Sequence, residues 1–180
     1  MMEWLVELDR SCFHLINQSG TPFWDSLMLF ATHKLSWIPL YLILIFFIIK
    51  EKGQESIWIL ATIGLVIACC DLGSVHLFKN TFQRLRPCHF FDSVRLVTEG
   101  CGGQYGFVSS HASNVFGLAI VIGKLMNKKH LFLALFLWAS IVAYSRVYVG
   151  VHYPLDILGG MIWGTFVALI FVSIYKFIRK

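Results

Sequence analysis

The chain has 180 residues, enough for one domain, and 57% of them are hydrophobic. A mean hydropathy of +0.70 is far above that of a soluble globular domain and indicates a protein of the lipid bilayer. The net charge of +5 comes from 15 basic and 10 acidic residues, most of which lie between apolar runs. This distribution indicates membrane topology and excludes a basic face for nucleic acid.

The N-terminal segment predicts a helix that lies on the membrane surface. Between Trp4 and Ile16, apolar residues recur at helical spacing with charged and polar residues beside them. Such an amphipathic segment is typical of an interfacial helix. We expect no removable signal peptide, because Glu3 and Glu7 stand where a secretory leader needs basic residues.

Five apolar runs follow and predict membrane-spanning helices. They extend from about Trp24 to Ile49, Ile57 to Phe78, Ala112 to Met126, Leu131 to Tyr148 and Leu155 to Phe177. We expect a kink in the first run, which contains Pro39. The third run is short for a hydrocarbon core of ~30 Å, so we expect its helix to begin near Ser109. The predicted fold is an all-α polytopic membrane bundle of five to six transmembrane helices, forming one domain over residues 1–180.

Three groups of polar residues lie at the ends of these runs. The groups are Lys79 with Arg86-Pro87, then Ser109-Ser110-His111, then Ser145-Arg146 with His152 and Asp156. Together they supply three permanent cations, two imidazoles and one carboxylate. Phosphoryl transfer depends on positioning and on stabilising negative charge spread over phosphate oxygens. The set therefore predicts a phosphatase.

The spacing of the polar residues also suggests individual roles. His152 and Asp156 are four residues apart, so on a helix the carboxylate can accept a hydrogen bond from one ring nitrogen. The other nitrogen is then free, which makes His152 the candidate nucleophile and His111 the candidate acid for the leaving oxygen. Ser109 and Ser110 precede an apolar helix, and the backbone amides of its first turn can bind an anion. We expect no metal and no other cofactor, because the acids of the outer loop are not grouped with histidines at ligand spacing.

The pattern Lys-x6-Arg-Pro, Ser-x-His and Ser-Arg-x5-His-x3-Asp over residues 79–156 resembles the three signatures of the type 2 phosphatidic acid phosphatase superfamily. The resemblance implies a nucleophile at His152 oriented by Asp156 and an acid at His111. It also implies phosphate contacts from Lys79, Arg86, Ser109, Ser110 and Arg146. The middle signature of the family is usually Pro-Ser-Gly-His, and Val108 and Ser110 replace its proline and glycine here. The soluble acid phosphatases and vanadate-dependent haloperoxidases of the same superfamily are disfavoured by the hydropathy of this chain.

The expected activity is hydrolysis of a phosphate monoester or diphosphate of a lipid through a phosphohistidine intermediate. The resemblance suggests undecaprenyl diphosphate as the favoured substrate, with phosphatidylglycerophosphate, phosphatidic acid and lipid A phosphates as alternatives. A non-catalytic protein that binds or transports a lipid phosphate is the alternative class, and the pairing of His152 with Asp156 argues against it. The expected partners are the substrate and membrane lipids, without nucleic acid, and the oligomeric state is left open.

The basic residues indicate how the chain is oriented. Seven lie on the side of the candidate site, and three of these belong to the site itself, which leaves four against eight on the other side. The eight are Lys50, Lys52, Lys124, Lys128, Lys129, Lys176, Arg179 and Lys180. By the positive-inside rule the eight are cytoplasmic. We therefore expect the site on the extracytoplasmic face of the bacterial inner membrane.

Other polar residues and cysteines carry separate expectations. Cys88 and Cys101 bracket the loop on the side of the site, and we expect them to form a disulfide. Arg84 is expected to be a surface cation, with contact to a second phosphate or headgroup as the alternative. Asp71 and His76 lie within the second apolar run, where such groups either contact substrate or hydrogen-bond neighbouring helices.

Overall fold

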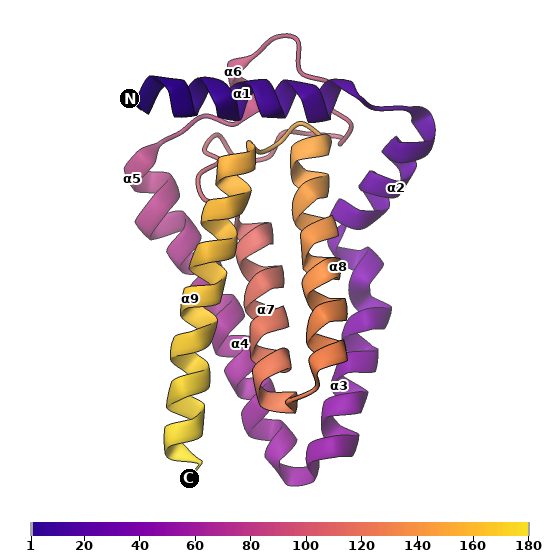
Figure 1. The fold of residues 1–180 in the computed structure, drawn as a ribbon, viewed down its shortest axis with the longest axis vertical. Helices are drawn as coiled ribbons and strands as arrows, with labels where there is room; N and C mark the ends of the chain where they lie inside the picture. Colours follow the sequence, from indigo (N-terminus) through magenta and orange to yellow (C-terminus); the bar gives the residue numbers. More distant parts are fainter. Residues whose placement is uncertain (1, 180) are drawn as a thin grey trace.

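The computed structural model describes residues 2–179, which form a bundle of helices with one helix lying across its end (Figure 1). The crossing helix is α1 (Met2–Gln18), and the C-terminus lies at the opposite end of the bundle. Within this described range the chain forms helices, turns and loops but no β-strand. The predicted all-α architecture is therefore confirmed.

Within residues 2–179 five helical passes run along the bundle. They are α2 (Pro22–Thr32) with η1 (Lys34–Trp37) and α3 (Ile38–Lys52), α4 (Ser56–Gly73) with η3 (Ser74–Lys79) and α5 (Asn80–Phe82), α7 (Ser110–Met126), α8 (Lys129–Tyr148), and α9 (Pro154–Ile178). Short turns at the end opposite α1 join α3 to α4 and α7 to α8, whereas the other connections lie at the α1 end (Figure 1). The turn η2 (Gly53–Glu55) separates the first two passes, and α6 (Pro87–Phe90) lies in the long loop before α7. In the described part of the chain, three helical stretches have the length and hydropathy of membrane spans, namely Lys34–Phe82, Lys129–Tyr148 and Pro154–Ile178.

The first predicted span bends ahead of Pro39. Its helix stops at Thr32, His33 is extended, and the Trp37 indole donates to the Ala31 carbonyl at 2.9 Å. Pro39 itself lies in the first turn of α3, where its missing N–H removes no helical hydrogen bond. The kink therefore arises from the break at His33 and not from the proline.

One face of helix α1, which carries polar and apolar side chains, packs against the bundle. Asp9, Phe13 and Asn17 are four residues apart and are all buried, whereas Trp4 and Leu15 are 67% and 76% exposed. The Asn17 amide donates to backbone carbonyls of the loop before α7 and of the end of α8, at 2.9 Å each. These bonds hold α1 across the end of the bundle.

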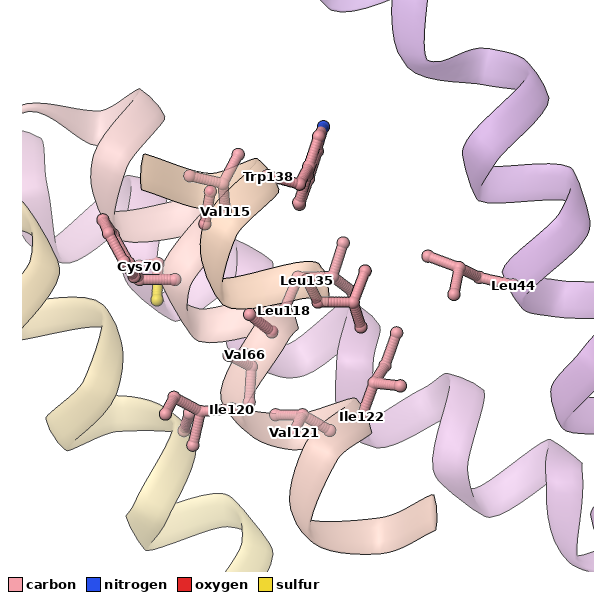
Figure 2. Close-up of a cluster of buried hydrophobic side chains, with 14 of the residues drawn as sticks. Leu44, Val66, Cys70, Val115, Leu118, Ile120, Val121, Ile122, Leu135 and Trp138 are labelled. Atoms are coloured by element: carbon pink, nitrogen blue, oxygen red, sulfur yellow. The ribbon is translucent and has the colours of Figure 1, made fainter. Parts of the chain in front are cut away.

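Helix α7 is the centre of the bundle and packs against α4, α8 and α9. Figure 2 shows the apolar side chains around it, including Val66 from α4 and Leu135 from α8. On the side of α9, Gly160 and Gly164 face the α7 backbone, and a Cβ at either position would collide with the Ser109 or Ser113 carbonyl. Small residues allow such close approach of membrane helices. The first turns of α7 and α9 are thereby brought together.

Candidate active site

A cavity of about 810 Å³ lies between α3, α4 and α7 and contains most of the predicted site residues at one end. The polar end is lined by Lys34, Lys79, Arg86, Ser110, His111, Arg146 and His152. The other end is lined by apolar side chains of three helices, among them Leu44, Ile48, Leu60, Leu118 and Ile122. Leu44 on α3 faces Leu118 and Ile122 on α7 across this space (Figure 2). A charged group and an apolar chain can therefore occupy the same cavity.

Lys79 is placed by the last turn of η3, a stretch of π-helix of the kind that often occurs at functional sites. Its ammonium donates to the Ser110 hydroxyl at 2.7 Å. The same hydroxyl lies 2.5 Å from the Ser74 hydroxyl. Lys79 and Ser110, in the first turn of α7, are thus hydrogen-bonded to each other at the cavity wall.

Arg86 is held by the loop that follows it. Its Nε donates to the Tyr105 carbonyl at 3.3 Å, and its Nη1 donates to the Cys101 carbonyl at 3.1 Å. Cys101 is linked to Cys88 by a disulfide, with the two Cα atoms 6.0 Å apart. Burial lowers the pKa of Arg86, and the negative charge of Asp156 opposes this shift. A guanidinium keeps its proton in proteins, so the group remains a cation.

Arg146 comes from the last turn of α8 and reaches across to the end of α2. Its Nη1 donates to the Thr32 hydroxyl. Its Nε is buried and has no hydrogen-bond partner within residues 2–179. Arg146 also lines the cavity.

His152 and Asp156 form a buried pair at the start of α9. His152 Nδ1 lies 3.2 Å from Asp156 Oδ2, which also accepts from the Tyr153 backbone N–H at 3.0 Å. Gly106 passes so close that a Cβ there would lie 2.8 Å from Asp156 Oδ2. Because Nδ1 is engaged, Nε2 is the ring nitrogen that remains for the cavity. Burial, followed by the positive charges of Arg86 and Arg146, holds the pKa of His152 well below its ordinary value, so the imidazole is neutral.

The structure brings six of the eight predicted site residues to the cavity wall: Lys79, Arg86, Ser110, His111, Arg146 and His152. Asp156 lies behind His152 and contacts it, as the sequence predicted. Ser109 is not at the wall. It is fully buried, and its hydroxyl caps α7 by accepting from the Ala112 N–H at 3.4 Å. The contact of Ser109 with phosphate stays a prediction, because a hydroxyl that accepts one hydrogen bond at a helix end can still donate another.

Four further ionisable residues differ from or add to the sequence expectations. Arg84, expected to be a surface cation, instead pairs with the buried carboxylates of Asp9 and Asp156. Asp71 lines the cavity, whereas His76 is exposed on the outside of η3. Lys34 also lines the cavity and was counted only as a topology charge. Its position inside an apolar run is the signal that could have identified it.

The described residues contain no group of three or more His, Cys, Asp or Glu side chains arranged to hold a metal ion. The charges that line the cavity are mostly basic, from two arginines and two lysines against the one carboxylate of Asp71. Such a set favours an anionic ligand with several oxygens, because arginine binds them in pairs and lysine acts as a point charge.

Comparisons with known proteins identify the family of the chain. Residues 55–180 match the PAP2 superfamily. Lipid A 4'-phosphatases of Porphyromonas gingivalis and Bacteroides thetaiotaomicron are 31% and 34% identical, over 99% and 97% of this chain and 78% and 80% of theirs. An undecaprenyl-diphosphatase of Sulfolobus acidocaldarius is 33% identical over 90% of this chain and 76% of its own.

Among solved structures, LpxE of Aquifex aeolicus superposes with a TM-score of 0.75 at 28% identity, covering 92% of this chain and 95% of that one. The family resemblance predicted from the three signatures is confirmed by these matches. Together with the apolar helices and the basic cavity, they show that the chain belongs to the PAP2 superfamily and is a membrane lipid phosphatase.

Proposed function

We propose that this protein hydrolyses a phosphate monoester of lipid A and releases inorganic phosphate. The observation that carries the proposal is the cavity itself, in which cations and His152 meet at one end and apolar side chains continue from there between α3, α4 and α7. The two lipid A 4'-phosphatases that align with nearly the whole chain support this choice of lipid. Undecaprenyl diphosphate is the second candidate, favoured by the similarity to an undecaprenyl-diphosphatase.

The proposed reaction has two steps at the phosphorus atom. Lys79, Arg86 and Arg146 hold the phosphate oxygens, and Nε2 of His152 attacks phosphorus while the bond to the lipid oxygen breaks. His111 gives its proton to the leaving oxygen. His111 then takes a proton from a water molecule, which attacks the phosphohistidine and releases inorganic phosphate with neutral His152 restored. Asp156 supports both steps by accepting a hydrogen bond from the Nδ1–H group and stabilising the positive charge that develops on the ring.

The proposed location is the extracytoplasmic face of the bacterial inner membrane. Seven of the eight basic residues that set the predicted topology lie in the turns and the helix end opposite α1 (Figure 1). The eighth, Lys180, lies outside the described residues. The positive-inside rule assigns that end of the bundle to the cytoplasm, which supports an outward-facing site.

A substrate panel tests the proposal on full-length protein in nanodiscs. The panel contains lipid A with only its 4' phosphate, lipid A with only its 1 phosphate, undecaprenyl diphosphate, phosphatidic acid and phosphatidylglycerophosphate. We expect phosphate release with the highest kcat/KM on the 4' monophosphate. A higher value on undecaprenyl diphosphate would replace the first candidate with the second, and binding without release from any lipid would indicate the non-catalytic class.

Two controls test the proposed chemistry independently of the lipid. His152→Ala is expected to abolish release while leaving the melting temperature close to that of the wild type. Because cations of the site supply the charge stabilisation, we expect a chelator to leave turnover intact. Activity lost to the chelator and restored by a divalent ion would contradict the proposed mechanism, and turnover by His152→Ala would reassign the nucleophile.

A further inference from the structure

Arg84 is shared between two buried carboxylates. Its Nη1 donates to Asp156 Oδ1 at 3.0 Å and its Nη2 donates to Asp9 Oδ2 at 2.5 Å. The carboxylate side chains are 0% and 1% exposed, and the guanidinium carbon lies 4.0 Å from the centre of the Tyr153 ring. Because the guanidinium is rigid and planar, its bond to one carboxylate sets the direction of its bond to the other.

Asp9 is also bonded to the start of α9. Its Oδ1 accepts from the Leu155 backbone N–H at 2.8 Å, a donor that has no partner within the helix. Leu155 directly precedes Asp156. One carboxylate of α1 therefore contacts both the helix end that carries Asp156 and the arginine that binds the Asp156 side chain.

We infer that Asp9 is a positioning residue for the phosphatase reaction, acting on His152 through Arg84 and Asp156. The inference rests on the proposed function of His152 as nucleophile. Asp156 Oδ2 accepts from the Tyr153 N–H and contacts the His152 ring, so the orientation of this carboxylate determines the direction of the imidazole. Arg84 fixes that orientation by binding the opposite oxygen. Asp9 itself is not among the residues that line the cavity and has no direct contact with substrate there.

Charge balance gives Asp9 a second effect on the same pair. Arg84 carries one positive charge and divides its hydrogen bonds between two carboxylates. Without the charge of Asp9, the whole positive charge of Arg84 faces Asp156 and weakens the pull of Asp156 on the positive imidazole that forms during attack. Both effects act on the chemical step and leave the phosphate-binding cations in place. The expected signature is therefore a loss of kcat with little change in KM.

The test compares Asp9→Asn with Glu7→Gln in the full-length protein. Asparagine keeps the size of the side chain and an acceptor for the Leu155 N–H but loses the charge that binds Arg84. Glu7 is an exposed acid on the same helix, so its variant controls for a change in charge of α1. We expect Asp9→Asn to lower kcat by about 10-fold to 100-fold with KM within twofold, Asp9→Glu to recover part of the loss, and Glu7→Gln to resemble the wild type.

An Asp9→Asn protein with wild-type kcat would overturn the inference, and so would a loss of activity that only follows a lower folded fraction. If Asp9→Asn does not fold, Arg84→Lys takes its place, because lysine keeps the charge but lacks the fork that joins two carboxylates. Unchanged kcat in Arg84→Lys would also overturn the inference. His152→Ala is assayed alongside. Turnover by that variant would contradict the proposed function, whereas an inactive His152→Ala with a fully active Asp9→Asn would contradict only the role of Asp9.

Discussion

Removal of the Cys88–Cys101 disulfide is expected to lower both stability and phosphate affinity. The two cysteines are separated by 13 positions, and loop-closure entropy gives about 3 kcal/mol of unfolding free energy for a loop near this length. At about 2–4 °C per kcal/mol for a chain of this size, the melting temperature should fall by about 6–12 °C. Phosphate affinity falls because the Cys101 carbonyl is an acceptor for Arg86 Nη1, and a freed loop no longer holds it in place.

The assay uses a Cys88→Ser/Cys101→Ser double variant in the same detergent as the wild type. Thermal unfolding followed by circular dichroism gives the stability difference, and steady-state kinetics should show KM raised by about tenfold, equivalent to ~1.4 kcal/mol. Cys12→Ser is the matched control, because Cys12 is a free cysteine of α1 outside the loop. Mass spectrometry that finds both thiols free in unreduced wild-type protein would refute the reasoning. A double variant with wild-type melting temperature and KM would do the same.

Three further predictions concern the cavity, pH and helix packing. Lys34→Gln is expected to raise KM about tenfold more for a lipid with two phosphates than for a lipid with one, because Lys34 adds a cation at the cavity wall. An equal rise in KM for both lipids would contradict this prediction. Because burial holds the pKa of His152 well below its ordinary value of 6.5, the unfolded chain gains a proton below about pH 6.5 that the folded chain does not. The contribution of His152 to the unfolding free energy should therefore fall by about 1.4 kcal/mol per pH unit below that point, and His152→Gln should make thermal stability between pH 7 and 5 less dependent on pH than in the wild type. Gly164→Ala should cost about 1–3 kcal/mol because its Cβ meets the Ser113 carbonyl, whereas Gly64→Ala, where a Cβ meets nothing within 4 Å, should leave the melting temperature unchanged or raise it.

The residues that the sequence located best are those whose spacing is set by a single helix or turn. His152 directly precedes Tyr153, the N-cap of α9, and Asp156 is the third residue of that helix, so their contact depends on one helix start and needs little help from the rest of the fold. Hydropathy likewise predicted the passes of the bundle, since membrane helices need long apolar runs. Ser109 and Ser110 could not be told apart in this way, because one hydroxyl caps α7 and the other meets Lys79. That difference depends on the angle at which the chain enters the helix.

Contacts between distant segments were not predictable from local spacing. Arg84 and Asp9 are 75 positions apart, and a lone arginine near a helix end is usually a solvated cation. Its partner is revealed only when α1 is placed across the start of α9. Lys34 was missed for a similar reason, since the break at His33 turns what looked like one apolar helix into two segments with a cation between them.

The burial of Asp9 nevertheless follows from the pattern of α1 once the phase of the helix is considered. Asp9, Phe13 and Asn17 are spaced by four residues, so they share one face, and Phe13 identifies that face as buried. A carboxylate in phase with a buried aromatic residue requires a charged or hydrogen-bonded partner, because an unpaired buried charge is too costly. The partner must come from whatever the helix covers. In an interfacial helix of a membrane enzyme, a buried acid in the apolar stripe therefore points to an ion pair with the helix ends beneath it, which here carry His152 and Asp156.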